Sequence, residues 1–157
     1  MPLVLQSESY SSSRPVARSV FVVTDAVLEG ETSVYSVQLE GPASQVIANT
    51  DFTAITLTLV DEVTHSVINS RTEQDILDIG GGSIGGNNVV ISPTALLTWT
   101  AQALDNIIVD PTDTVTIEWH RAIFRFEFDI GAGAEVGLHE VRIPVKRAFQ
   151  SFLQTLT

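Results

Sequence analysis

Cysteine is absent from the 157-residue sequence, which excludes a disulfide framework, a thiolate nucleophile and any zinc site built on cysteine. Apolar runs of transmembrane length are absent too, and the opening residues MPLVLQ lack the charged start and long apolar stretch of a signal peptide. We therefore expect no membrane association and no export. Charged residues are few, at 17% against 44% hydrophobic residues, which is typical of a globular protein rather than a disordered one.

Basic residues are scarce, since 8 lysines and arginines face 19 aspartates and glutamates for a net charge of -11. From Asp25 to Glu118 the chain has fourteen acidic residues and a single basic one, Arg71. An acidic middle repels phosphate backbones, so we expect no nucleic-acid binding by the body of the protein. Two interpretations of the other basic residues stay open: they dock on an acidic neighbour, including a second copy, or they belong to an ordinary solvated surface. These residues lie toward the chain ends and are Arg14, Arg18, Arg121, Arg125, Arg142, Lys146 and Arg147.

Helical periodicity is rare, and the most informative stretch, residues 118–129, alternates with the period of a strand. Between residues 122 and 128 the even positions hold an alanine and three phenylalanines, whereas Arg125 and Glu127 occupy odd positions. Successive side chains of a strand point to opposite faces, so the phenylalanines share one face and the two charges share the other. A helix would instead bury Arg125 among the rings. The pattern predicts the central strand of an antiparallel β-domain, with Phe124, Phe126 and Phe128 in its core.

Further strands are predicted where apolar and polar residues alternate between turn-forming residues. The predicted strands cover residues 35–40, 55–60, 66–70, 89–91, 96–100 and 139–145, with a hairpin turn at residues 61–65. Pro144 lacks an N–H, so the last strand is expected to lie at a sheet edge or to end there. Residues 71–78 are the only helical candidate before the C-terminus, and residues 80–88 are predicted to be a glycine-rich loop. Many short strands with almost no helix predict a β-sandwich, with a small barrel as the alternative.

The two ends of the chain differ in composition from this middle part. Residues 1–30 are predicted to be an N-terminal arm, because a serine-rich polar leader precedes the β-branched run at residues 16–23. That run either pairs with a sheet edge, of its own domain or of a neighbour, or is an ordinary first strand with a frayed start. Residues 31–145 are predicted to form the sandwich domain, and residues 146–157 a tail or short helix. The apolar stripe of this tail consists of Phe149, Phe152, Leu153 and Leu156.

Acidic side chains offer two candidate sites, and each has a simpler structural explanation. Glu127 and Asp129 would lie about 7 Å apart on one strand face. Glycosidases use carboxyl pairs at such a separation, but this pair is also the wet side of a phenylalanine-lined strand. Asp105, Asp110 and Asp113 offer oxygen ligands for calcium, although they lack the alternating acids and central glycine of a calcium loop, and Asp-Pro is a common turn former. We expect no catalytic residue and no metal site from either group.

The remaining candidate sites are weaker. The glycines at residues 80–86 lack the Lys-Ser/Thr ending of a phosphate-binding loop, so no nucleotide cofactor is expected. Trp99 and Trp119 are candidate platforms for a sugar, although large aromatic side chains in a β-sandwich more often belong to the core. The histidines share no metal-ligand spacing; they are His65, His120 and His139. The sequence therefore predicts no cofactor and a protein that is not an enzyme.

Three segments together resemble small immunoglobulin-like structural proteins of tailed bacteriophage particles. They are residues 55–70, residues 97–110, which begin with Leu-Thr-Trp, and residues 118–128, which lead to the Gly-x-His-x-Val strand at residues 137–143. The shared motifs are strand patterns that cover about residues 50–145 and leave out the two ends. The resemblance implies an immunoglobulin-like sandwich and a virion component on the head, neck or tail.

What the resemblance implies for function is a non-enzymatic virion protein, such as a head decoration protein, assembled in the host cytoplasm. It is expected to form a homo-oligomer through its termini and sheet edges and to bind other capsid, neck or tail proteins. The alternative is a carbohydrate-binding module for host attachment, which requires Trp99 or Trp119 to be exposed to solvent. A β-sandwich hydrolase is a third hypothesis, and it would need a convergent pair of acids in a cleft.

Overall fold

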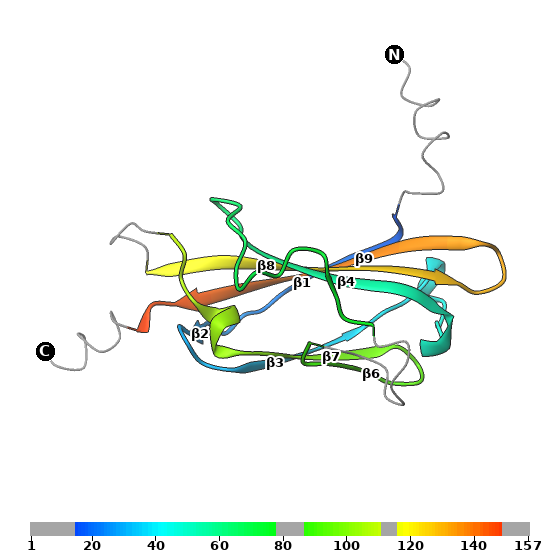
Figure 1. Ribbon diagram of the computed structural model, residues 1–157, viewed down its shortest axis with the longest axis horizontal. Helices are drawn as coiled ribbons and strands as arrows, with labels where there is room; N and C mark the ends of the chain where they lie inside the picture. Colours follow the sequence, from blue (N-terminus) through cyan, green and yellow to red (C-terminus); the bar gives the residue numbers. More distant parts are fainter. Residues whose placement is uncertain (1–14, 78–86, 111–115, 149–157) are drawn as a thin grey trace, which may run out of the picture.

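The computed structural model describes residues 15–77, 87–110 and 116–148, and these form two β-sheets that face each other (Figure 1). The larger sheet has the strand order β1-β9-β8-β4-β5, with β2 also paired to β9, and the smaller sheet has the order β3-β7-β6. The strands are β1 (Pro15–Val22), β2 (Val27–Leu28), β3 (Ser33–Gln38), β4 (Phe52–Asp61), β5 (Gln74–Asp75), β6 (Val89–Ile91), β7 (Leu96–Ala101), β8 (Ile117–Asp129) and β9 (Ala134–Lys146). The fold is the predicted all-β, immunoglobulin-like sandwich.

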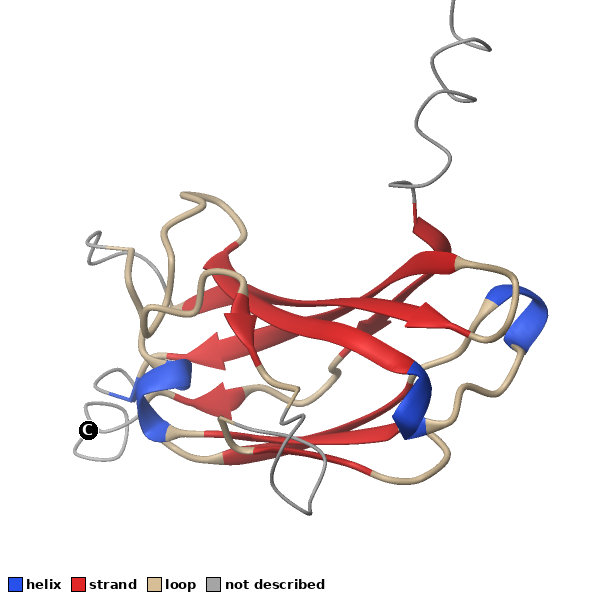
Figure 2. Ribbon diagram, turned by 45° about the vertical axis from the view of Figure 1, so that its right-hand side comes forward, coloured by secondary structure: helices blue, strands red, loops and turns tan. Residues whose placement is uncertain are grey.

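Short 3-10 helices lie at the ends of the sandwich (Figure 2). They are η1 (Pro42–Ser44), η2 (Asn49–Asp51) and η3 (Ala103–Asn106). η3 joins the two sheets at one end, because the side chain of Asn106 donates to the carbonyl of Glu31 at 2.7 Å and Gly30 N–H donates back to the carbonyl of Asn106 at 2.9 Å. The connection between β2 and β3 is thereby fixed to the segment that follows β7.

β8 lies in the middle of the larger sheet, between β9 and β4, and this confirms the predicted central strand. Its even-numbered residues from Glu118 to Phe128 are buried, whereas the odd-numbered residues from Trp119 to Glu127 are only partly buried. The phenylalanine rings therefore enter the core on one side of the sheet, as the alternation of strand side chains requires.

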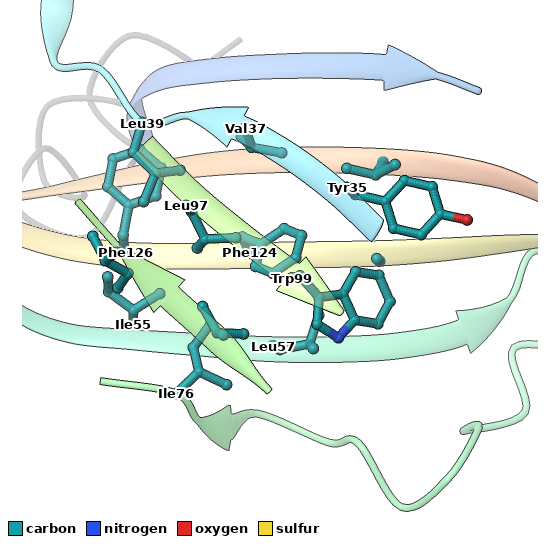
Figure 3. Close-up of a cluster of buried hydrophobic side chains, with 14 of the residues drawn as sticks. Tyr35, Val37, Leu39, Ile55, Leu57, Ile76, Leu97, Trp99, Phe124 and Phe126 are labelled. Atoms are coloured by element: carbon teal, nitrogen blue, oxygen red, sulfur yellow. The ribbon is translucent and has the colours of Figure 1, made fainter. Parts of the chain in front are cut away.

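The smaller sheet covers these rings with its own alternating side chains (Figure 3). Leu97 and Trp99 of β7 are fully buried, which confirms the predicted strand and its inward face. Trp99 contacts Tyr35 and Phe124, with ring centroids 5.5 Å and 5.8 Å away. Its contact with Phe124 is edge-to-face, a favourable geometry for aromatic pairs. The core is thus built from aromatic and aliphatic side chains of both sheets.

The helix predicted at residues 71–78 is wrong over the part that the structure describes. Residues 71–77 contain no helix, and β5 within them pairs with β4 at the edge of the larger sheet. The reason is tertiary packing, because Arg71, Ile76 and Leu77 are all buried against the rest of the domain. A helix of about two turns has too few hydrogen bonds to compete with that burial.

The hairpin turn after β4 is confirmed, but the strand predicted after it at residues 66–70 is not formed. Asp61 accepts hydrogen bonds from the N–H and the hydroxyl of Thr64, at 2.7 Å and 2.5 Å. Val67 then pairs with Val60 in a single isolated bridge. The pairing ends there because Asn69 and the residue after it adopt left-handed backbone angles, with φ of 52° and 55°.

Pro144 lies neither at a sheet edge nor at the end of its strand, so that expectation is wrong for β9. β9 continues to Lys146 and pairs with β8 on one side and with β1 and β2 on the other. Val23 N–H donates to the carbonyl of Arg142, and Glu29 N–H donates to the carbonyl of Lys146. Pro144 therefore faces the gap between β1 and β2, where its missing N–H interrupts the parallel ladder instead of ending β9.

The described part of the N-terminal segment pairs with its own domain. β1 and β2 both run parallel to β9 and extend the larger sheet. The run at residues 16–23 therefore uses the sheet edge of its own chain. Residues 1–14, the glycines at 80–86 and residues 149–157 of the tail lie outside the described residues, so the predictions for them stay predictions.

Candidate functional site at an open sheet edge

The outermost strand of the larger sheet, β1, carries an open backbone edge. It pairs with β9 on one side, and no other described strand lies on its other side. The hydrogen bond of 2.9 Å from Val23 N–H to the carbonyl of Arg142 shows which residues of this segment direct their backbone N–H and C=O toward β9. Because backbone groups alternate in direction along a strand, the N–H and C=O of Val20 and Val22 point away from β9. They are positioned to pair with another strand.

Apolar side chains flank this edge on both faces of the sheet. Val20, Phe21 and Val22 are 53%, 57% and 42% exposed. Phe21 is aligned with the buried Val141 of β9 and so points toward the interior side of the sandwich. Among the described residues the smaller sheet has three strands, and none of them covers Phe21. We call Val20, Phe21 and Val22, together with their backbone edge, the β1 ledge.

In the part of the chain that the structure describes, the β1 ledge lacks the features by which natural edge strands avoid pairing. Protected edges carry lysine, proline or a bulge, or are covered by another element. Residues 19–24 contain no charged residue and no proline, and the register shift in β1 lies at its start, between Pro15 and Ala17. The ledge can therefore accept a strand from another chain through main-chain hydrogen bonds and apolar contacts.

A pocket of about 290 Å³ lies beside β1, where the end of β3 and η1 approach β8 and β9. Within it the hydroxyl of Ser19 and Nδ1 of His139 form a hydrogen bond. Burial lowers the pKa of His139, against the opposing charge of Glu140. The ring is therefore mostly neutral at pH 7, and its Nδ1 can accept a hydrogen bond from the Ser19 hydroxyl.

The pair of Ser19 and His139 does not form a catalytic triad with the described residues. A serine nucleophile needs a base that a third group orients, but Nε2 of His139 is buried without a hydrogen-bond partner. The two residues are register partners on β1 and β9. Their bond therefore adds a side-chain link to the ladder that holds the ledge strand in the sheet.

Asp105, the first candidate calcium ligand, lies in a buried ion pair. Its oxygens accept hydrogen bonds from Nε and Nη2 of Arg71 at 2.5 Å and 2.9 Å, and from the side-chain amide of Asn69 at 2.7 Å. Burial alone would raise the pKa of Asp105, but hydrogen bonds from Arg71, Asn69 and Gln102 N–H, and the charge of Arg71, outweigh it and lower the pKa. This carboxylate is occupied within the protein, and Asp113 lies outside the described residues.

The other candidate metal ligands do not converge. Asp110 donates its backbone N–H to Glu118 at 2.7 Å, and Nε2 of His120 lies 2.6 Å from the same buried carboxylate. His65 is exposed in the turn after β4, whereas His139 lines the pocket beside β1. Within residues 15–77, 87–110 and 116–148, no group of three or more histidine, aspartate or glutamate residues could hold a metal ion.

The predicted pair of carboxylates on β8 has two separate structural partners. Glu127 accepts a hydrogen bond from Arg125 at 2.8 Å, and Asp129 accepts one from the N–H of Gly131 at 2.8 Å in the turn before β9. Neither carboxylate lines the pocket. The simpler explanation, that both carboxylates lie on the solvent-facing side of the strand, accounts for their positions.

The tryptophans do not provide the exposed platform that the carbohydrate-binding alternative requires. Trp99 is fully buried. Trp119 is partly buried, and the guanidinium of Arg142 lies 5.2 Å from its ring centroid. Glu62 holds that guanidinium with hydrogen bonds of 2.7 to 3.1 Å. Trp99 is therefore unable to stack on a sugar, and one face of Trp119 is already used.

Three basic residues that the sequence places toward the chain ends lie on the outer face of the larger sheet. Their ion pairs are Arg121 with Glu140, Arg125 with Glu127, and Arg142 with Glu62. Since these arginines pair within the chain, the solvated-surface interpretation fits them better than docking on an acidic neighbour.

Comparisons with models of protein families and with curated proteins give no match for this chain. Among the described residues, no helix has the length and apolar character needed to cross a membrane. The resemblance to phage structural proteins is a hypothesis that depends on the strand motifs alone.

Proposed function

We propose that this chain is a non-enzymatic structural protein that assembles by pairing its β1 ledge with the β1 ledge of a second copy. The observation that carries the proposal is the exposure of Val20, Phe21 and Val22 on a strand whose outer edge has no described partner strand. An open apolar edge is a template for strand pairing. Two identical edges meeting about a two-fold axis form a closed, self-complementary interface.

The outward direction of the backbone groups of Val20 and Val22 defines how two copies would pair. In an antiparallel arrangement Phe21 of each copy faces Phe21 of the other, and Val20 lies opposite Val22 of the second copy. Both valines direct their N–H and C=O outward, so each such pair exchanges two main-chain hydrogen bonds. The phenylalanines then occupy the non-hydrogen-bonded position, where opposing side chains come closest. The two larger sheets become one continuous sheet.

The proposal that this assembly is part of a phage particle rests on the sequence resemblance. In this proposal the protein is a virion component, assembled in the host cytoplasm, with capsid, neck or tail proteins as further neighbours. Particles with many copies tolerate modest interfaces, because each contact raises the effective concentration for the next. The net charge of -11 supports a position away from packaged DNA.

The test is the mass of the full chain in solution, measured by size-exclusion chromatography with light scattering. Val20→Pro removes an N–H that points outward rather than toward β9, and Val20→Lys adds a charge to the ledge. Val63→Lys is the matched control, because Val63 is 76% exposed in the turn after β4. We expect the wild type and Val63→Lys to form assemblies of two or more chains and both Val20 variants to be monomers.

Circular dichroism checks that the Val20 variants keep the β-rich fold and the melting cooperativity of the wild type. A monomeric wild type contradicts the proposal. Folded Val20 variants that keep the wild-type mass contradict it as well, because the ledge would then not be the contact.

A further inference from the structure

The outer face of the smaller sheet carries no charged side chain over its three strands. Outward positions follow from the burial pattern, in which every second residue of β3, β6 and β7 is buried. Val34 and Val90 are each 63% exposed on this face. We call the outward residues the uncharged face; they are Val34, Ser36, Gln38, Val90, Leu96, Thr98 and Thr100.

The outer face of the larger sheet is different in kind. It carries arginine–glutamate pairs on β8 and β9, including Arg121 with Glu140 at 2.7 Å and Arg125 with Glu127 at 2.8 Å. Such charges are typical of a surface that stays in water. The chain has a net charge of -11, yet this face carries none of its charged side chains. Because charged residues are depleted at the core of interfaces, the contrast singles out the uncharged face as a contact surface.

Four of the seven side chains of the uncharged face are β-branched valines or threonines, and they are neighbours across the strands. Val34 lies opposite Thr100, and Ser36 lies opposite Thr98, with their hydroxyl oxygens 3.3 Å apart. Val90 lies on the other side of Thr98. Valine and threonine are restricted at χ1, so covering them loses less side-chain entropy than covering lysine or glutamate.

We propose that the uncharged face is a second self-association surface, which packs against the same face of another copy. This inference rests on the proposed function and adds a second contact to it. We assign a second copy as the occupant, because two chains of net charge -11 repel each other less at this face than at a face that carries acidic side chains. Aligned sheet-on-sheet packing, with sheets about 10 Å apart, is the geometry that such faces adopt.

The area of the uncharged face determines whether it can hold two copies together by itself. Three strands at about 4.8 Å spacing and six residues at about 3.3 Å rise span roughly 14 Å by 20 Å, or on the order of 300 Å². A stable interface buries about 800 Å² on each partner. The face is therefore too small to hold a dimer alone. It contributes once the β1 ledges have paired, because a ledge dimer carries two such faces and the first face contact raises the effective concentration for the second.

Two separate self-complementary surfaces on one chain lead to assemblies larger than a dimer. Ledge pairing makes the dimer, and the uncharged faces, which lie on the opposite sheet of the sandwich, join one dimer to the next.

The test uses the full chain with Val34→Lys and Val90→Lys, each compared with Val63→Lys, which adds the same charge in the exposed turn. Mass is measured by light scattering and sedimentation velocity over a range of concentrations. We expect the wild type and Val63→Lys to exceed two chains, both face variants to stop at two chains, and Val20→Pro to give one chain. Val34→Thr, which adds no charge and keeps the branched shape, is expected to assemble as the wild type does.

Face variants that keep the wild-type mass overturn this inference and leave the proposed function intact, provided that Val20→Pro is still a monomer. Val20→Pro with the wild-type mass overturns the proposed function instead. Thermal melts followed by circular dichroism show whether a variant is folded, and Val90→Lys gives a second, independent position if Val34→Lys does not fold.

Discussion

The ring of Phe126 lies against the bare Cα of Gly137, its register partner across the β8–β9 ladder. A Cβ on Gly137 would lie 2.1 Å from Cζ and 2.3 Å from Cε2 of that ring. Since Phe126 is only 2% exposed and part of the core, the ring has little room to move. Packing therefore requires the glycine of the Gly-x-His-x-Val motif.

Gly137→Ala is expected to destabilise the domain, because the added methyl group displaces the ring of Phe126. Overpacking of this kind lowers the free energy of unfolding by about 1–3 kcal/mol, which urea denaturation measures. The control is Gly41→Ala, where the new Cβ would meet its nearest neighbours at an ordinary contact distance of 3.5 Å. Equal stability of Gly137→Ala and the wild type would contradict the packing argument.

The ion pair between Arg71 and Asp105 lies in the interior, with side-chain exposures of 4% and 0%. Arg71→Met leaves the carboxylate buried without its counter-charge, so the free energy of unfolding is expected to fall by about 3–5 kcal/mol. Arg125→Met is the matched control, because its pair with Glu127 is 38% and 36% exposed. Exposed pairs contribute about 0–1 kcal/mol. A similar loss in both variants, measured by urea denaturation, would contradict a special role for the buried pair.

Acid is expected to weaken the attachment of β1 through His139. Burial lowers the pKa of this residue in the folded state, so between that pKa and the unfolded value of about 6.5 the unfolded chain binds more protons. The stability contribution is therefore complete above about pH 6.5 and is lost as the pH falls through the folded pKa. The protection factors of the β1 amides in native-state hydrogen exchange, which divide out the pH dependence of intrinsic exchange, are expected to fall as the pH falls over this range.

Two variants separate this effect from general acid denaturation. His139→Asn keeps an acceptor near Ser19 but cannot take up a proton, so the pH dependence of the β1 protection factors between pH 7 and 5 is expected to weaken. Ser19→Ala removes the hydroxyl but leaves the ring buried, so the pH dependence is expected to persist. An unchanged pH profile in His139→Asn would show that another group controls β1.

The parts of the fold that depend on local alternation could be predicted from the sequence. The phenylalanine face of β8 and the inward pair Leu97 and Trp99 follow from a period of two, because a strand with one buried face leaves no other arrangement. The failed helix at residues 71–78 shows the limit of this reasoning. Its residues form an extended segment at the edge of the sheet because Arg71 forms an ion pair with Asp105, 34 positions away in the sequence. No local sequence pattern encodes that contact.

The candidate site shows the same division between local and distant causes. The run at residues 16–23 is predicted to be a strand from its β-branched residues, and pairing with a sheet edge is one of the two interpretations that its composition allows. The exposure of Phe21 does not follow from that composition, because alternation places this ring on the interior side with Val141. Only the number of strands in the opposing sheet leaves it uncovered. The uncharged face could have been recognised from the sequence, since its outward positions hold only serine, threonine, glutamine, valine and leucine.

Pro144 supplies a direct test of how the ledge strand ends. Extension of the β1–β9 register would place Val23 beside Ile143, and the carbonyl of Val23 would then need the N–H that Pro144 lacks. In Pro144→Val the new amide should join this ladder and exchange slowly with solvent, which hydrogen exchange by NMR detects. Stability is a poor readout, because a net gain of about 0.5–1.5 kcal/mol from one hydrogen bond is offset by about 0.4–1 kcal/mol from the freer unfolded chain. Rapid exchange of the new amide, at the rate of exposed loop amides, would mean that the course of the chain between β1 and β2, rather than the proline, ends the strand.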